Sequence, residues 1–180
     1  DLQSAESLSA LLSRMKILKE KLREKHGRNV ALALKIAPDL DDAQIRDIAA
    51  IARREGIDGI VATNTTVSRA GVESYANGMQ AGGLSGAPLR ERATRVLRIL
   101  SRELKNEVPL IGVGGILAGA DAVEKLDAGA SLVQLYTALV YQGPGLLRRL
   151  KADLAQLLRR DGFASVADAV GADHRVGAAE

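Results

Sequence analysis

The sequence predicts an α/β fold in which four parallel strands are covered by outer helices, as in about half of a (β/α)8 barrel. Three observations lead to this prediction. Short apolar runs alternate with amphipathic segments four times, no hairpin turn signal joins two runs, and the first run has two unlike faces. Alternation without hairpins predicts parallel strands. A complete barrel takes about 250 residues and eight strands, so a chain of 180 residues accounts for part of one.

The composition excludes several classes of protein. With 47% hydrophobic and 26% charged residues, the chain is typical of a globular protein, and it contains no cysteine. Disulfides, a thiol nucleophile and cysteine-ligated zinc are therefore excluded. His26 and His174 lie near opposite ends of the chain, so we expect no metal site. A net charge of +3 and four aromatic residues (three Tyr and one Phe) argue against a nucleic-acid partner.

The first predicted element is an amphipathic helix within residues 8–25. Apolar residues fall on one face at helical spacing, and most basic residues lie elsewhere. The apolar positions are Leu8, Leu11, Leu12, Met15, Leu18 and Leu22. Glu20 and Glu24 interrupt the basic face, which favours a solvated surface over a membrane or nucleic-acid patch.

An apolar run at residues 30–37, closed by Pro38, predicts the first buried parallel strand. Large side chains alternate along it with alanines and with Lys35, so one face is apolar and the other is small and carries a cation. An open doubly wound sheet is the alternative architecture. We favour the barrel because an interior that holds a cofactor needs such a second face.

The remaining elements follow in β-α order. Asp41 with Gln44 resembles a helix-capping box, and Gly56 stands where a C-terminal cap is expected. Later strands are predicted at residues 59–63, 109–114 and 132–136. Helices are predicted around residues 96–104, with Pro88 in the first turn, around 121–126, and over the leucine-rich segment 146–158.

The candidate functional residues follow the predicted strands, at the edge where such barrels build their active sites. Lys35 lies near the end of the first strand, where a buried ammonium is costly unless an anion or cofactor faces it. The alternative is a lysine that extends to solvent. Residues 63–66, Thr-Asn-Thr-Thr, offer amide and hydroxyl groups that suit a planar ligand. Such residues also form ordinary turns.

Two glycine-rich loops suggest an anion site. The loop at residues 67–87 is unusually long and ends in Gly-Gly-Leu-Ser-Gly at 82–86, which could wrap N–H groups around an anionic or flat ligand or be an exposed insertion. Gly-Val-Gly-Gly at 112–115 leads toward a helix and could hold a phosphate together with residues 136–137. A Rossmann site is disfavoured because Leu117 occupies the third glycine position.

Five motifs, taken together, resemble the dihydroorotate dehydrogenases in order and spacing from residue 31 to 150. They are Lys-Ile-Ala-Pro-Asp-Leu (35–40), Ala-Thr-Asn-Thr-Thr (62–66), Gly-Gly-Leu-Ser-Gly (82–86), Ile-Gly-Val-Gly-Gly-Ile (111–116) and Gly-Ala-Ser-Leu-Val-Gln-Leu-Tyr (129–136). The first two are more similar to the quinone-dependent class than to the soluble class. The resemblance implies that residues 1–180 are the C-terminal half of a single FMN-binding (β/α)8 barrel domain. It also implies oxidation of dihydroorotate to orotate in pyrimidine biosynthesis, with electrons passed to a membrane quinone.

The resemblance implies roles for the residues of the matching motifs. Lys35 would approach FMN and stabilise negative charge on its reduced ring. The other cofactor-binding residues would be Thr63, Gly86, Gly115, Tyr136 and Thr137, the last three around the FMN phosphate. Asn64 and Thr65 would bind the pyrimidine. No catalytic residue is expected in this chain, because the family's serine base lies in its N-terminal half.

The resemblance further implies that the N-terminal half belongs to the same polypeptide. We expect either a nicked protein whose pieces stay associated or a preceding segment separated before Asp1, with the isolated chain inactive. The protein would be peripheral to the inner membrane of a bacterium, or to the mitochondrial inner membrane in a eukaryote. Two other functions remain open. One is a phosphate-binding barrel isomerase or synthase that needs neither Lys35 nor a flavin, and the other is a non-catalytic half-barrel binding module.

Overall fold

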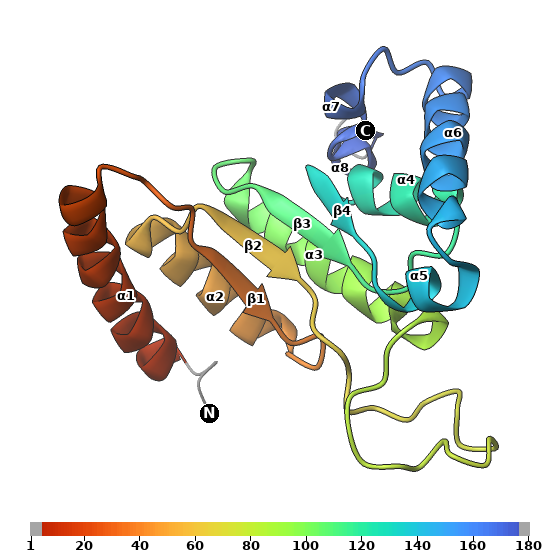
Figure 1. Cartoon of the computed structure of the whole chain (residues 1–180), viewed down its shortest axis with the longest axis horizontal. Coiled ribbons are helices and arrows are strands. Elements are labelled where there is room, and N and C mark those ends of the chain that lie inside the picture. The colour runs from red at the N-terminus through yellow and green to blue at the C-terminus, as the bar shows by residue number, and fades with distance from the viewer. Residues whose placement is uncertain (1–4, 177–180) are drawn as a thin grey trace.

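A computed structural model describes residues 5–176 and has a parallel sheet at its centre (Figure 1). The strands are β1 (Ala33–Ile36), β2 (Gly59–Ala62), β3 (Leu110–Val113) and β4 (Leu132–Gln134). They are adjacent in the order β1-β2-β3-β4, and every neighbouring pair is parallel. A doubly wound sheet reverses its strand order at a switch point. The sequential order found here matches a barrel segment, so the predicted architecture is confirmed.

Helices alternate with the strands as the sequence predicts. The first four are α1 (Ala5–His26), α2 (Asp42–Glu55), α3 (Arg90–Leu104) and α4 (Gly119–Asp127), and a short 3-10 turn, η1 (Ala87–Leu89), precedes α3. After β4 come α5 (Thr137–Gln142), α6 (Gly145–Arg160), α7 (Val166–Ala169) and α8 (Ala172–Val176). Helix α2 packs between α1 and α3, and α4 packs against α6. In Figure 1, α2 and α3 lie behind the same face of the sheet.

Local sequence signals determine where α2 begins and ends. The Asp41 carboxylate accepts a hydrogen bond from the Gln44 N–H at 2.8 Å, and the Gln44 side chain accepts one from the Asp41 N–H at 3.0 Å. This reciprocal pair is the predicted capping box. At the other end Gly56 adopts a left-handed conformation with φ 67°, which glycine adopts without steric strain. Both cap predictions are confirmed.

The strands are shorter than the sequence predicts. The run at residues 30–37 forms a strand only over Ala33–Ile36, because β2 begins at Gly59, which pairs with Ala33. Pro88 also differs slightly from its predicted place. It lies in η1, and the α-helix proper starts two residues later at Arg90. A proline suits either first turn, because neither turn needs its missing N–H.

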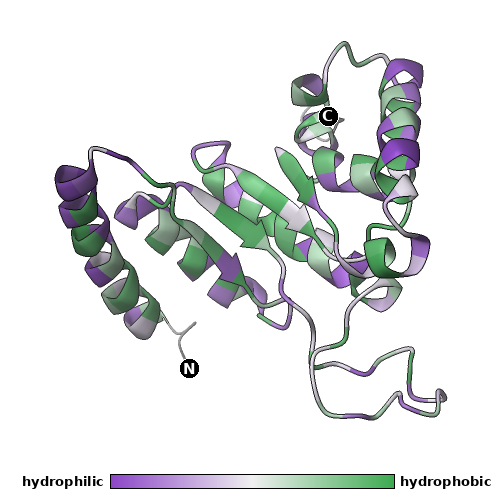
Figure 2. Cartoon of the chain, viewed as in Figure 1, coloured by the Kyte–Doolittle hydropathy of each residue, from purple (hydrophilic) through white to green (hydrophobic). Residues whose placement is uncertain are grey.

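The main core lies between the sheet and the helices behind it. Leu34 and Ile36 of β1 face this core, and Ile60 of β2 is fully buried in it. The helices contribute Ile45, Ile48, Ala52, Val96, Leu97 and Leu100. Strands in Figure 2 are accordingly coloured mostly as hydrophobic, whereas the helices carry bands of both kinds. Burial of the helical apolar stripes against the sheet is the main force that holds these elements together.

The two unlike faces predicted for the first strand are present, but one detail of the prediction is wrong. Ala33 and Lys35 lie on the face opposite the core, and both are exposed rather than buried. The physical reason is that, within residues 5–176, no helix covers this face of β1, since α2 and α3 pack behind the other face. Lys35 therefore has solvent around its stem instead of a desolvated strand environment.

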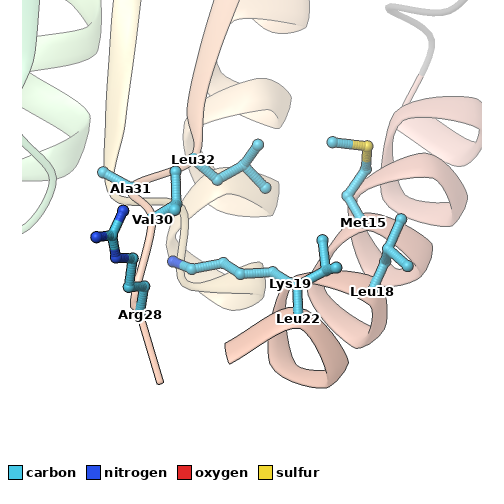
Figure 3. Close-up of a pocket in the computed structure, with 8 residues that line it drawn as sticks. All are labelled: Met15, Leu18, Lys19, Leu22, Arg28, Val30, Ala31 and Leu32. Carbon is cyan, nitrogen blue, oxygen red and sulfur yellow. The ribbon is translucent and has the colours of Figure 1, made fainter. Parts of the chain in front are cut away.

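Helix α1 leaves part of its apolar face uncovered. Leu8 and Leu12 are buried, whereas Met15, Leu18 and Leu22 are exposed. These three residues face the segment 28–32 across an apolar cavity of about 180 Å³ (Figure 3). The cavity lies beside the chain that enters β1, at the opposite end of the strand from the candidate ligand residues. Among the described helices, none has a stretch long and apolar enough to cross a bilayer.

Candidate functional site

A cavity of about 270 Å³ opens at the carboxyl ends of the four strands. All the candidate ligand residues line it: Lys35, Thr63, Asn64, Thr65, Gly86, Gly115, Tyr136 and Thr137. Ser85, Leu89, Val113, Gly114, Ile116, Gln134 and Leu135 complete its wall. The structure thus brings together residues as far apart in the chain as Lys35 and Thr137. Their individual roles remain predictions.

The backbone of the segment after β2 is held by hydrogen bonds to the neighbouring strands. The Thr63 N–H donates to the Val113 carbonyl at 3.0 Å, and the Asn64 N–H donates to the Ile36 carbonyl at 2.7 Å. Thr63 is buried and its hydroxyl donates to the Asn64 carbonyl at 2.9 Å. Within residues 5–176 the side-chain amide of Asn64 forms no hydrogen bond, and the residue is exposed. Neighbouring strands therefore hold an unused amide at the cavity wall.

Asp39 binds the start of the loop that follows residues 63–65. Its carboxylate accepts hydrogen bonds from the Thr66 hydroxyl and from the Val67 N–H, the latter at 2.9 Å. Arg92 forms an ion pair with the same carboxylate at 3.0 Å. The sequence did not predict this role of Asp39, although the residue belongs to the motif at 35–40. It shapes the site without lining the cavity.

The long loop at residues 67–87 is held by its own arginine. The Arg69 guanidinium donates to the carbonyls of Gln80 and Gly82, both at 2.6 Å. At the base of the loop, Thr66 and Leu84 form an antiparallel bridge. These bonds return the chain to the cavity at Ser85 and Gly86, next to Thr137, whose hydroxyl donates to Ser85 Oγ at 2.8 Å. The loop is an ordered part of the site rather than an unattached insertion.

The glycine loop after β3 lies against the start of α3. Gly115 is buried and has φ 73°, and a Cβ built on it would stand 2.4 Å from the Arg90 Cα. No larger residue fits there without moving the backbone. The N–H groups of Gly115 and Ile116 donate to no acceptor within the described part of the chain. Such free N–H groups beside a helix start can bind an anion.

Charged groups surround the junction between this loop and α3. The Arg90 guanidinium pairs with the Asp121 carboxylate at 2.6 Å, and this hydrogen bond raises the pKa of Arg90. Lys125 on α4 is completely buried, and its ammonium donates to the Arg90 carbonyl at 3.0 Å and to the Thr94 hydroxyl. Burial lowers the pKa of Lys125 to about 8. None of these residues was a candidate from the sequence.

No group of His, Asp or Glu side chains in the described ranges could hold a metal ion. The chemistry available at the cavity is that of the Lys35 ammonium, the side-chain amides of Asn64 and Gln134, hydroxyls and backbone N–H groups. This donor set suits a ligand that carries both a phosphate and a planar ring with carbonyl groups.

The fold and cavity define a (β/α)8-barrel segment with a candidate ligand cavity at the carboxyl edge of its strands. The comparisons identify which barrel family it is. The family model for dihydroorotate dehydrogenase matches residues 1–158, and the chain belongs to that family. The resemblance of the five sequence motifs to the dihydroorotate dehydrogenases is thereby confirmed.

Curated relatives are named dihydroorotate dehydrogenase (quinone). The protein from Thiobacillus denitrificans is 56% identical over 156 residues, which cover 87% of this chain and 46% of the relative. The protein from Rhodospirillum rubrum is 51% identical over 174 residues, which cover 97% of this chain and 47% of the relative. The chain therefore spans about half the length of these relatives.

Solved structures agree with the sequence comparison. Dihydroorotate dehydrogenase from Eimeria tenella in complex with ferulenol superposes with a TM-score of 0.91 at 36% identity, over 97% of this chain and 50% of that one. The ligand-free structure from the same organism gives a TM-score of 0.91 at 37% identity and covers 51% of that chain. The fold predicted from the sequence is thereby confirmed.

Proposed function

We propose that the protein containing this chain is a quinone-dependent dihydroorotate dehydrogenase. It would oxidise dihydroorotate to orotate in pyrimidine biosynthesis with FMN as cofactor and pass the electrons to a membrane quinone. The observation that carries the proposal is the single cavity at which the candidate residues from all four strand ends meet. The names of the relatives support the substrate and the electron acceptor.

The residues at the cavity fit FMN. The free N–H groups of Gly115 and Ile116 suit its phosphate, with Gly86 and Thr137 alongside. The ammonium of Lys35 and the hydroxyl of Thr63, which also line the cavity, suit the carbonyl-bearing ring. When bound, FMN supplies the acceptor for the hydride that leaves C6 of dihydroorotate.

The protein side chains of this half would bind, orient and stabilise charge. The Lys35 ammonium places a positive charge at the cavity wall, where it stabilises negative charge that develops during the reaction. Asn64 can donate and accept hydrogen bonds, as the imide and carbonyl groups of the pyrimidine require. Thr65 would extend this contact. The base that removes the C5 proton is expected from the remaining half of the protein.

The remaining half of the protein would cover two exposed features of this chain. Strands β1 and β4 are the edges of the sheet, and exposed strand edges are an aggregation hazard. The apolar face of α1 and residues 30–32 lies beside the β1 edge (Figure 3). We propose that the N-terminal half packs there and also carries the contact with the inner membrane. The prediction about the chain break at Asp1 lies outside the described residues, and the one-domain prediction for residues 1–180 stays a prediction.

Turnover by the full-length protein tests the proposed function. Dihydroorotate should be oxidised with a short-chain quinone as acceptor and much more slowly with fumarate or NAD. An isomerase or synthase would leave the quinone unreduced, and a binding module would show no turnover at all. Either result would refute the proposal.

Replacing Asn64 by alanine should weaken orotate binding to the full-length protein by about tenfold. The reason is that polar groups of the bound pyrimidine lose their partner, at a cost of roughly 1–3 kcal/mol. Fluorescence or calorimetric titration with orotate measures the effect. Asn29→Ala, at an exposed position near the other end of β1, is the matched control. Unchanged orotate affinity in Asn64→Ala would show that this residue only forms a turn.

A further inference from the structure

The Gly115 loop packs against η1 and the start of α3, the segment that directly follows the Gly86 loop. Gly86 precedes η1, whose last residue, Leu89, leads into Arg90. A Cβ built on Gly114 would stand 3.0 Å from the Leu89 side chain, and one built on Gly115 would overlap the Arg90 backbone. The position of the Gly115 loop relative to Gly86 is therefore set by how the start of α3 is held.

Asp121 holds the side chain of Arg90 and the end of the Gly115 loop at the same time. One carboxylate oxygen pairs with the Arg90 guanidinium. The other accepts hydrogen bonds from the N–H groups of Leu117 and Ala118 at 2.9 and 3.0 Å. Asp121 is almost fully buried, so its bonds to the loop N–H groups are shielded from solvent, whereas the Arg90 side chain is about half exposed. Asp121 thus links α3 to the loop 113–118.

Lys125, on the same helix as Asp121, binds the backbone of the same arginine. Its ammonium donates to the carbonyl of Arg90 at 3.0 Å. Space for its stem comes from Gly112 on β3, since a Cβ there would stand 3.0 Å from the Lys125 Cβ. The first glycine of the Gly-Val-Gly-Gly motif therefore serves this lysine rather than a phosphate.

Burying the ammonium of Lys125 in this space carries an unfavourable desolvation free energy. It forms no ion pair with any described residue. The charged groups that influence it are Glu124, Asp121, Arg90 and Arg98, and burial outweighs them in lowering its pKa to about 8. An apolar side chain of similar length would avoid this desolvation. What the lysine adds is a directed hydrogen bond to the first residue of α3.

We propose that Lys125 and Asp121 are positioning residues for the FMN phosphate. Together they hold Arg90 between the two glycine loops, so that the N–H groups near Gly86 and Gly115 keep the spacing that a phosphate needs. The inference rests on the proposed function, because it assumes that this cavity holds FMN. Neither residue touches the ligand.

Lys125→Met in the full-length protein tests the inference. FMN and riboflavin differ by the phosphate, so the flavin-free protein is titrated with each and the ratio of the two dissociation constants is compared. We expect the variant to lose at least tenfold of the wild-type preference for FMN, with riboflavin affinity and melting temperature nearly unchanged. Lys151→Met, at an exposed lysine on α6, is the control and should keep the preference.

Asp121→Asn provides a second test if Lys125→Met does not fold. It removes the charge that pairs with Arg90 but keeps an oxygen for the loop N–H groups, and it should also reduce the FMN preference. If neither variant changes the ratio, or if both ligands weaken equally, the positioning role is wrong while FMN binding stands. If the wild-type protein does not bind FMN, the proposed function itself fails.

Discussion

Replacing Lys35 by alanine in the full-length protein should lower turnover of dihydroorotate by about 100-fold or more, whereas FMN occupancy should change little. Lys35 lies on the face of β1 opposite the core and lines the cavity beside Thr63. A charge in this place acts mainly as negative charge develops, so its loss affects the rate more than the binding of the cofactor. Steady-state kinetics and the flavin content of the purified variant measure the two effects separately.

Lys151→Ala is the matched control for this prediction, because Lys151 is exposed on α6 and does not line the cavity. It should keep wild-type turnover. Normal turnover in Lys35→Ala would contradict the assignment of this lysine. A variant that loses FMN and turnover in equal proportion would show that Lys35 acts only in cofactor binding.

Replacing Gly115 by alanine should weaken FMN binding by about 100-fold. Alanine at a positive φ costs of order 1–3 kcal/mol, and the added Cβ would stand 2.4 Å from the Arg90 Cα. The loop must therefore move, which displaces the free N–H groups proposed to hold the phosphate. Titration of the flavin-free full-length protein with FMN measures the loss.

Gly145→Ala is the control for the glycine variant. Gly145 lies at the start of α6 without a positive φ, and its added Cβ would approach only the end of the Arg149 side chain, at 3.4 Å. FMN affinity within twofold of wild type in Gly115→Ala would rule out this loop as the phosphate site. Riboflavin should be less affected than FMN, because it has no phosphate to lose.

Local patterns in the sequence were sufficient to predict the order and type of the main elements. The alternation at Leu34, Lys35 and Ile36 correctly separated a core face from an open face. The capping residues of α2 likewise depend only on neighbours within the same helix. The strand ends were harder to predict, because β1 ends where its partner strand ends, and pairing with residues about 26 positions away is not visible in a local pattern.

The candidate ligand residues could be predicted because each directly follows a strand, and parallel strands bring their carboxyl ends to one edge. The network around Arg90 could not be predicted. Arg90 and Asp121 are 31 positions apart on different helices. Lysine is ordinarily exposed on a helix, whereas Lys125 is fully buried. Its burial depends on how α4 packs against α3 and on the space left by Gly112. Only the tertiary structure reveals these contacts.

The central claim is that the cavity at the carboxyl ends of β1 to β4 is part of an FMN site. The most direct measurement is to purify the full-length protein, record its visible absorption, denature it and identify the released cofactor by mass. We predict a yellow protein that releases one FMN per chain. A colourless protein that does not take up added FMN would contradict the account.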